Sequence, residues 1–249
     1  VGAVSGVAVG AEKAWKLCKE RDLPRAFVVN RMDTENANFE KTFDALREQF
    51  GPSVVPLQLP IMEGEKFVGY VDIIKLEGVQ FDGKNRKSVP IPDSLETEVD
   101  HYRDILVETA AESSEELMEK YFGGDEFTQE ELIAGIRSGI LSGSLAPVFC
   151  TAAAPQLGVP RLLDNIVHYM PSPDEAAAKI GKNPRDDSEV KRTCSASEPF
   201  SAQVFKTLTD NFVGKISLVK VYSGKLAVDT PIYNANAEKS EKIGTVYYM

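Results

Sequence analysis

The sequence predicts an α/β fold: a parallel sheet, interrupted by an inserted α+β subdomain and followed by an incomplete antiparallel β-barrel. Apolar strands alternate with amphipathic helices over residues 1–59, a pattern typical of a parallel sheet. Short strands and then helices replace this pattern over residues 60–145, and the buried-strand pattern returns in residues 146–173. Residues 174–197 are polar and indicate a linker, whereas residues 198–249 alternate between apolar and polar positions, as antiparallel strands do.

The composition is typical of a soluble globular protein. Of the 249 residues, 43% are hydrophobic and 27% are charged, no apolar run reaches membrane-spanning length, and no secretory signal opens the chain. The net charge of −10 argues against bulk electrostatic binding to nucleic acid. Cys18, Cys150 and Cys194 are far apart and odd in number, which indicates reduced thiols in the cytoplasm. His101 and His168 have no partner at metal-ligand spacing, so no metal site is expected.

The helices and strands of the sheet-forming part follow from apolar spacing and capping residues. Residues Val1–Val4 resemble the tail of a strand without its start, so we expect the sequence to be a piece of a longer chain. A helix over residues 39–50 is predicted, with Asn36 or Asn38 as its N-cap and Gly51 at its end. The other predicted elements are a helix at Glu12–Asp22, strands at Ala26–Val29, Ser53–Leu59 and Ala146–Cys150, and a helix at Gly158–Met170 with Leu162, Leu163, Ile166 and Val167 facing inward.

Within the insert, the stretch Gly78–Asn85 superficially matches a phosphate-binding loop. Asn85 replaces the magnesium-binding hydroxyl and no helix follows, so we interpret the stretch as a hairpin with a turn at Asp82-Gly83. Two capping boxes, Ser113 with Glu116 and Thr128 with Glu131, open two helices. The remaining predictions are insert strands at Phe67–Leu76, Gly78–Phe81 and Lys87–Ile91, a helix at Asp93–Ala111, and barrel strands at Phe200–Leu208, Lys215–Tyr222, Pro231–Asn234 and Lys242–Tyr248, too few to close a barrel.

Acidic residues are concentrated between Asp93 and Glu131. This stretch holds fourteen Asp and Glu residues against two basic ones, Arg103 and Lys120. The ordinary meaning of such a block is a solvated helix surface. The alternative is a docking surface for a basic partner.

Asn30 and Asp33 follow the predicted strand Ala26–Val29, at the end of the sheet where ligands bind in open α/β folds. The two oxygens of the Asp33 carboxylate match the adjacent donors of a guanine base, its ring N–H and its amino group. Adenine lacks this donor pair and would leave the carboxylate unpaired. Asn30 carries both a donor and an acceptor, so it could hold either the loop or the purine. Because Asn and Asp are also common in loops and N-caps, the motif alone is not specific.

A second candidate loop, Thr151-Ala152-Ala153, follows the predicted strand Ala146–Cys150. Its backbone N–H groups would point at the guanine carbonyl oxygen, and its small side chains would let the purine come close. Both candidate loops end strands of the same predicted sheet, which makes the pair more specific than either loop.

Together these motifs resemble bacterial translation elongation factor G and its relatives among the ribosomal translocation GTPases. Asn30-Arg31-Met32-Asp33 resembles the family's Asn-Lys-x-Asp guanine motif, and Cys150–Ala154 resembles its second guanine loop. Phe67–Ile74 resembles the entry to the family's inserted subdomain, and Glu198–Ala202 with Val221–Leu226 resembles the start of its β-barrel domain II. The resemblance spans nearly the whole chain.

By this resemblance, residues 1–59 and 146–173 are the C-terminal part of a P-loop-GTPase-type domain, and Asn30, Arg31, Asp33, Thr151, Ala152 and Ala153 bind guanine. Arg31 replaces the usual Lys and Ala152 the usual Ser, which indicates a divergent member with altered nucleotide affinity. In the family, the phosphate loop, switch regions and magnesium ligands precede the position of Val1. The resemblance therefore implies GTP or GDP with Mg²⁺ in the full-length protein, and no cofactor, catalytic residue or activity in this central fragment.

The resemblance also implies a function and partners. The full-length protein would be a cytoplasmic, ribosome-bound GTPase that promotes movement of tRNA and mRNA, and its acidic block 93–131 would face the ribosomal stalk protein. Three alternatives stay open: a release-factor-type GTPase, a ribosome-protection relative, and a ribosome-binding protein without GTPase activity.

Overall fold

A computed structural model describes residues 1–82, 85–175, 178–184 and 186–247. The chain forms two compact units, Val1–Pro171 and Ser172–Met249. None of the described helices combines the length and the apolar character that crossing a membrane requires.

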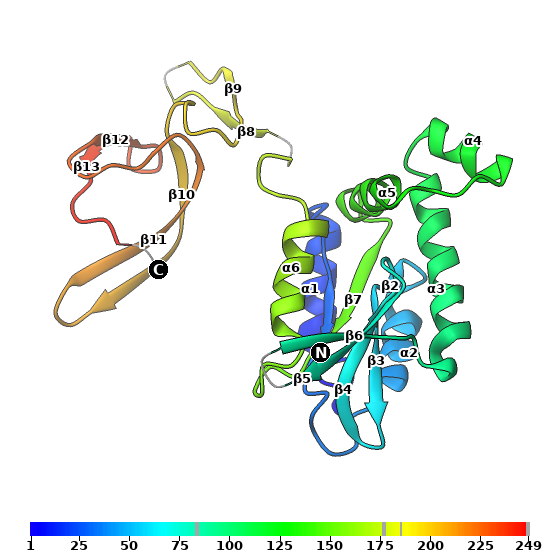
Figure 1. Ribbon diagram of the computed structural model, residues 1–249. Coiled ribbons are helices and arrows are strands. Elements are labelled where there is room, and N and C mark those ends of the chain that lie inside the picture. The colour runs from blue at the N-terminus through cyan, green and yellow to red at the C-terminus, as the bar shows by residue number, and fades with distance from the viewer. Residues whose placement is uncertain (83–84, 176–177, 185, 248–249) are drawn as a thin grey trace. The chain divides into compact units, whose positions relative to one another are not determined.

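Three parallel strands form the central sheet of the first unit: β1 (Phe27–Val29), β7 (Ala146–Cys150) and β2 (Val54–Pro56), in the order β1-β7-β2 (Figure 1). β7 is buried along its whole length, as expected for a parallel strand with a neighbour on each side. The chain start also pairs in parallel with this sheet, because Gly2 forms a bridge with Asn30. The parallel sheet predicted from the alternating strands and helices is therefore confirmed.

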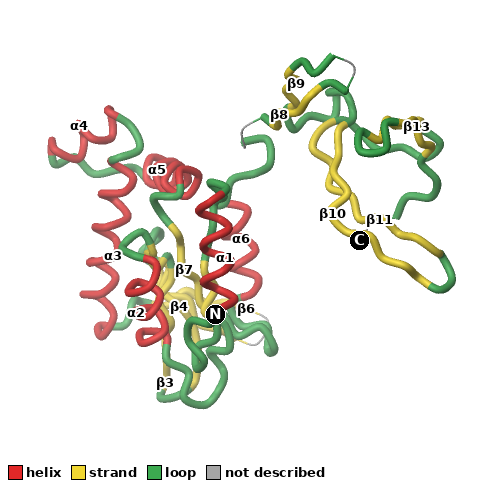
Figure 2. The backbone as a smooth tube through the Cα atoms, turned by 180° about the vertical axis from the view of Figure 1, so that it is seen from behind, coloured by secondary structure: helices red, strands yellow, loops and turns green. Residues whose placement is uncertain are grey.

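Helices pack on this sheet through aromatic side chains. In both views α1 (Val9–Glu20) and α6 (Val159–Tyr169) lie on one side of β7, and α2 (Phe39–Phe50) and α3 (Asp93–Ala111) on the other (Figures 1 and 2). The Trp15 ring of α1 stacks on Phe27 of β1 with 5.5 Å between centroids, and Phe50 of α2 lies 4.8 Å from Trp15. The N-cap of α2 is Asn38, one of the two predicted candidates, whose side chain accepts a hydrogen bond from the Lys41 N–H.

The insert combines an antiparallel sheet in the order β3-β4-β5-β6 with three helices. The predicted strand Ser53–Leu59 is divided between two sheets, because β2 stays in the parallel sheet while β3 begins the insert at Gln58. β5 and β6 pair as a hairpin, but Gly83 of the predicted turn lies outside the described residues. The elements are β3 (Gln58–Glu63), β4 (Lys66–Asp72), β5 (Glu77–Asp82), β6 (Asn85–Val89), α3, α4 (Glu115–Gly123) and α5 (Gln129–Ser142).

One of the two predicted capping boxes is confirmed and the other is wrong. Thr128 and Glu131 exchange side-chain and backbone hydrogen bonds at the start of α5. At the start of α4 the cap is Ser114 rather than Ser113. The Ser113 hydroxyl instead donates to the Ala110 carbonyl at the end of α3, which places it in the preceding helix terminus.

The orientation predicted for α6 is confirmed for Leu162, which packs against the core, but is wrong for the other three apolar residues. Asn165 and Tyr169 are the buried residues of this helix, whereas Leu163, Ile166 and Val167 are 58%, 44% and 77% exposed. The physical reason is the ion pair between Arg161 of α6 and Asp72 of the insert. Asn165 and Tyr169 lie on the same side of the helix as Arg161, so this side is the covered one.

The described residues of the second unit form three antiparallel hairpins. They are β8 (Lys179–Lys182) with β9 (Glu189–Arg192), β10 (Ser201–Asp210) with β11 (Gly214–Ser223), and β12 (Pro231–Asn234) with β13 (Lys239–Lys242). The first hairpin lies within the segment predicted to be a linker. The strand predicted at Lys242–Tyr248 is wrong for residues 243–247, because β13 ends at Lys242 and pairs with β12 through an earlier stretch, and Tyr248 lies outside the described residues.

Candidate functional site

The two candidate loops meet at the carboxyl ends of β1 and β7. The Thr151 N–H donates to the Val29 carbonyl at 2.9 Å and so continues the pairing of the strands. One step further, the Met32 N–H donates to the Thr151 carbonyl at 3.2 Å. Parallel pairing therefore brings residues 30–33 and 151–153 together, although more than a hundred residues separate them in the sequence.

The Asn30 side chain binds the two loops to each other. Its Oδ1 accepts hydrogen bonds from the Arg31 N–H at 2.7 Å, the Ala153 N–H at 3.0 Å and the Thr151 hydroxyl at 3.3 Å. The sequence left two roles open for Asn30, holding the loop or holding the purine. In the structure its acceptor oxygen holds the loop.

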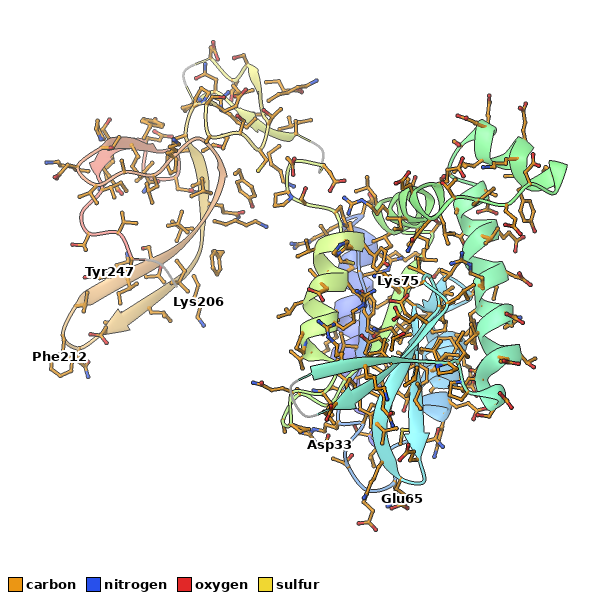
Figure 3. All side chains as sticks on the ribbon, in the orientation of Figure 1. Asp33, Glu65, Lys75, Lys206, Phe212 and Tyr247 are labelled. Atoms are coloured by element: carbon orange, nitrogen blue, oxygen red, sulfur yellow. The ribbon has the colours of Figure 1, made fainter. Side chains whose placement is uncertain are left out.

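The turn after Asn30 presents Asp33 to solvent. Arg31 adopts a left-handed conformation with φ 65°, and both the N–H and the hydroxyl of Thr34 donate to its carbonyl, at 3.2 and 2.7 Å. Met32, only 1% exposed, anchors the turn, while Arg31 and Asp33 are exposed. Figure 3 labels Asp33 on this turn. Within the described part of the chain the Asp33 carboxylate has no hydrogen-bond or ion-pair partner, so both of its oxygens can accept from a ligand.

The second loop is closed on itself before α6 begins. Ala152 and Leu157 exchange two backbone hydrogen bonds of 2.9 Å. Gly158 then adopts φ 75°, and a Cβ at this position would lie 2.9 Å from the Cys150 carbonyl oxygen, so only glycine fits. The N–H groups of Thr151, Ala152 and Ala153 are all engaged within the protein. The next N–H, that of Ala154, has no partner among the described residues.

The site carries no activated nucleophile or metal cluster. Burial raises the pKa of the Cys150 thiol well above its usual range, so this thiol stays protonated at the end of β7. Among the residues that the structure describes, no three His, Cys, Asp or Glu side chains are grouped closely enough to hold a metal ion. The arrangement suits recognition of a ligand through hydrogen bonds.

Sequence reasoning missed three residues that shape the site. Thr34 holds the Arg31 carbonyl, Gly158 allows α6 to start directly against the loop, and Arg161 of α6 forms a buried ion pair with Asp72 of β4. A glycine before a helix is a visible signal for a tight turn. The ion pair has no local signal, because its partners are 89 residues apart.

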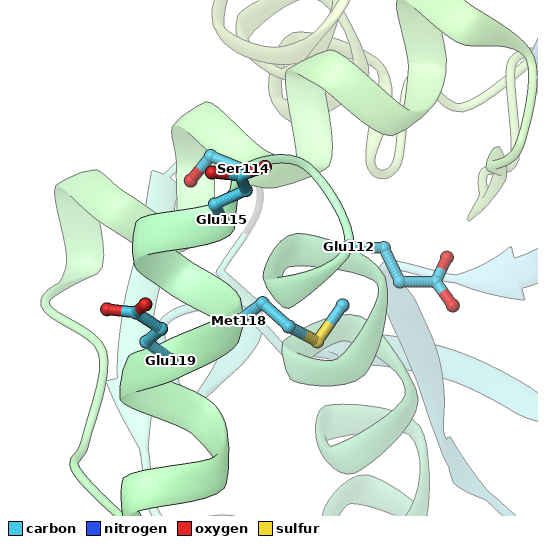
Figure 4. Close-up of a pocket in the computed structure, with 5 residues that line it drawn as sticks. All are labelled: Glu112, Ser114, Glu115, Met118 and Glu119. Carbon is cyan, nitrogen blue, oxygen red and sulfur yellow. The ribbon is translucent and has the colours of Figure 1, made fainter.

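A second candidate surface is the acidic face of the insert. Of the fourteen acidic residues between Asp93 and Glu131, all but Glu98 and Glu131 are exposed. Where α3 meets α4, an open groove of about 490 Å³ is lined by Glu112, Ser114, Glu115, Met118 and Glu119 (Figure 4).

Comparisons with known proteins match both units. The model of the elongation factor Tu GTP-binding domain matches residues 1–172, and that of elongation factor G domain 2 matches residues 199–249. Among solved structures, the crystal structure of a protein from Thermus thermophilus superposes with a TM-score of 0.80 at 28% sequence identity. The match covers 98% of this chain and 34% of that chain, so the present chain spans about a third of that relative's length.

Proposed function

Because the chain belongs to the family of elongation factor Tu-type GTP-binding domains, we propose that Asn30–Asp33 and Thr151–Ala153 read the guanine base of GTP and GDP. The observation that carries this proposal is the exposed Asp33 carboxylate beside a loop that Asn30 holds in place. Its two oxygens accept from the ring N–H and the amino group of guanine.

The other site residues support the base in this proposal. The Ala153 N–H shares its proton between Asn30 Oδ1 and the guanine carbonyl oxygen, and the unpartnered Ala154 N–H lies one residue further along. The aliphatic stem of Arg31 lies along the nucleotide. Ala152 is fully buried and cannot contact the base with its side chain, so its contribution is to the loop.

The full-length protein, in this proposal, is a GTPase that acts on the ribosome during elongation and promotes translocation of tRNA and mRNA. The elongation factor G-type second unit, matched over residues 199–249, favours this role. No stretch of the 249 residues provides a phosphate-binding loop, and phosphoryl transfer depends on holding phosphates and Mg²⁺. We therefore assign no catalytic residue here and expect the Mg²⁺ to be held, with the phosphates, by residues outside this sequence.

Exchange of Asp33 for Asn tests the base-reading role in the full-length protein. The amide donates where the carboxylate accepted, so Asp33→Asn should lower GDP affinity about 100-fold or more, as expected for two lost charge-assisted hydrogen bonds. Affinity for xanthosine diphosphate, which carries an oxygen in place of the amino group, should rise. Glu35→Gln, an equal charge change two residues away on an exposed side chain, is the matched control. An unchanged preference for GDP in Asp33→Asn would contradict the proposal.

The 249-residue chain by itself should bind guanine nucleotides only weakly, because base contacts remain without phosphate contacts. Titration with a fluorescent GDP analogue measures this. Micromolar or tighter binding would show that the chain holds phosphates as well. GTP hydrolysis by the full-length protein, with and without ribosomes, separates the translocation role from a ribosome-binding protein that lacks GTPase activity.

The acidic face of the insert, residues 93–131, is proposed to dock a basic surface of the ribosomal stalk protein. Charge complementarity supports this, since twelve exposed carboxylates lie on this stretch. Reversing Glu115 and Glu119 to Lys should weaken stalk binding and flatten its salt dependence. Reversing Glu12 and Glu20 of α1, which are equally exposed, should leave binding unchanged; equal effects from the two pairs would contradict a localised docking surface.

A further inference from the structure

Helix α6 binds the insert through its polar side. Arg161 pairs with Asp72 of β4, and their side chains are only 12% and 5% exposed. One and two turns further along the same side, Asn165 and Tyr169 are 2% and 3% exposed. Burial raises the pKa of Tyr169 to about 12, and the neighbouring Asp72 carboxylate adds to this shift, so the phenol stays neutral. Arg161, Asn165 and Tyr169 thus form a buried polar side of α6, which the Arg161–Asp72 ion pair joins to the insert.

The Asp72 end of this contact is held rigidly. Oδ1 of Asp72 accepts hydrogen bonds from the Ile74 and Lys75 N–H groups, at 3.1 and 3.0 Å. Arg103 of α3 donates to the carbonyls of Ile73 and Ile74 from the other side, at 3.2 and 2.5 Å. The remaining oxygen of Asp72 binds Arg161. Segment 72–75 is thus an anchor within the insert, to which α6 is attached by one buried charge pair.

The Arg161 end of this contact lies next to the second guanine loop. Arg161 is in the first turn of α6, three residues after Gly158, whose backbone lies against the Cys150 carbonyl. Immediately before it, Leu157 closes the loop by its two bonds with Ala152. A displacement of the first turn of α6 would therefore move the loop that begins at Thr151.

Other contacts between α6 and the insert are less buried. The Arg86–Asp164 pair has a separation of 3.5 Å, with side chains 42% and 46% exposed. Arg137 of α5 donates to the His168 carbonyl at the far end of α6, at 2.7 Å. Exposed pairs contribute little, whereas removal of one partner of a buried pair leaves an uncompensated charge. The Asp72–Arg161 pair is therefore the contact most able to control the start of α6.

We infer that Asp72 and Arg161 are positioning residues through which the inserted subdomain sets the place of the second guanine loop, residues 151–157. The effect of this positioning on guanine recognition rests on the proposed function. Its consequence is coupling: a partner that shifts the insert relative to α6 changes nucleotide affinity, and a bound nucleotide changes the affinity for that partner by the same factor.

Amide hydrogen exchange on the 249-residue chain tests the positioning role directly. In Arg161→Met the Ala152 and Leu157 amides should exchange at least tenfold faster, while the amides of β7 keep their protection. Arg86→Met, which removes the exposed pair to the same helix, should change neither. Arg161→Lys, which retains the positive charge, should restore most of the loop protection. Unchanged loop exchange in Arg161→Met would overturn the inference, as would a loss in Arg161→Lys equal to that in Arg161→Met.

A second variant covers the case in which Arg161→Met does not fold. Asp72→Asn keeps an oxygen for the Ile74 and Lys75 N–H groups but removes the charge that binds Arg161. The same tenfold acceleration at Ala152 and Leu157 is expected, with the amides of Ile74 and Lys75 still protected. Wild-type exchange at the loop in this variant would overturn the inference.

Base selectivity in the full-length protein separates loop positioning from general damage. The preference for GDP over 6-thioguanosine diphosphate, in which sulfur replaces the carbonyl oxygen while the ring N–H and the amino group remain, should fall at least tenfold in Arg161→Met. The preference for GDP over inosine diphosphate, which lacks the amino group that Asp33 reads, should stay within twofold. An equal fall in both ratios would contradict the inference. If the wild-type protein shows neither preference, the proposed function fails, and the exchange experiment alone still decides the positioning role.

Discussion

Replacing Asn30 by Ala removes a side-chain acceptor that joins the two candidate loops. Its Oδ1 accepts from Arg31 at 2.7 Å, Ala153 at 3.0 Å and the Thr151 hydroxyl at 3.3 Å. A typical intramolecular hydrogen bond contributes about 0.5–1.5 kcal/mol net, and the longest of the three contributes least. Asn30 is half-buried, so water replaces part of what is lost. We expect Asn30→Ala to lower the free energy of unfolding of the first unit by about 2 kcal/mol.

Urea unfolding followed by tryptophan fluorescence measures this change. Trp15 is the only tryptophan of the chain and packs between Phe27, Phe50 and the Arg25 guanidinium, so its signal reports the first unit alone. With a urea dependence of about 2 kcal/mol per molar, the loss corresponds to a midpoint lower by about 1 M.

Asn30→Asp is the matched control because it keeps the acceptor oxygen while removing the amide donor. Its midpoint should fall much less than that of Asn30→Ala, since a charged acceptor forms stronger bonds that offset its desolvation. Equal losses in the two variants, or an unchanged midpoint in Asn30→Ala, would refute the role assigned to this oxygen.

Three further predictions concern the surroundings of the site and the insert. Gly158→Ala should destabilise the first unit by about 1–2 kcal/mol, because an L-residue is strained at φ 75° and its Cβ meets the Cys150 carbonyl. The control is Gly10→Ala in α1, where an added Cβ has no neighbour within 4 Å and should not destabilise the unit. Equal urea midpoints of the two variants would contradict this prediction. Hydrogen bonds from Lys120, and then from Thr128, hold the pKa of Glu131 below its usual value, so this stabilisation is present above pH 4.5 and is lost as the pH falls through the lowered pKa. Lys120→Met should raise the Glu131 pKa in a carboxyl NMR titration, and no change would show that Lys120 is not the cause. Iodoacetamide should label the exposed Cys194 of the native protein but label Cys150 only after unfolding, because burial raises the Cys150 pKa; peptide mass spectrometry decides, and native labelling of Cys150 would contradict the buried state.

Features with local causes were predictable from the sequence. The helix Asp93–Ala111 and the strands Ala146–Cys150 and Pro231–Asn234 have the predicted bounds. The Thr128–Glu131 capping box formed as expected, since its four-residue pattern contains all its partners. The meeting of the two candidate loops was predictable for another reason, because the carboxyl ends of parallel strands lie at the same edge of a sheet.

Features that depend on distant partners were not predictable. Of the four apolar residues predicted to face inward in α6, Leu162 does so, whereas the side joined to the insert is the polar one, through the Asp72–Arg161 pair, 89 residues apart in sequence. The contact by which the Asn30 oxygen holds the second loop could not be predicted, because it depends on the position of Ala153, on another strand's loop. The β8–β9 hairpin has one large apolar residue in each strand, Ile180 and Val190, too few to distinguish it from a polar linker.

The most direct test of a guanine site in this chain is NMR of the 249-residue protein with millimolar GMP or AMP. If residues 30–33 and 151–154 read guanine, GMP should shift the amide signals of these residues, above all Asp33, Ala153 and Ala154, and AMP should leave them in place. Equal shifts with both nucleotides, or shifts elsewhere with these loops unmoved, would contradict the account.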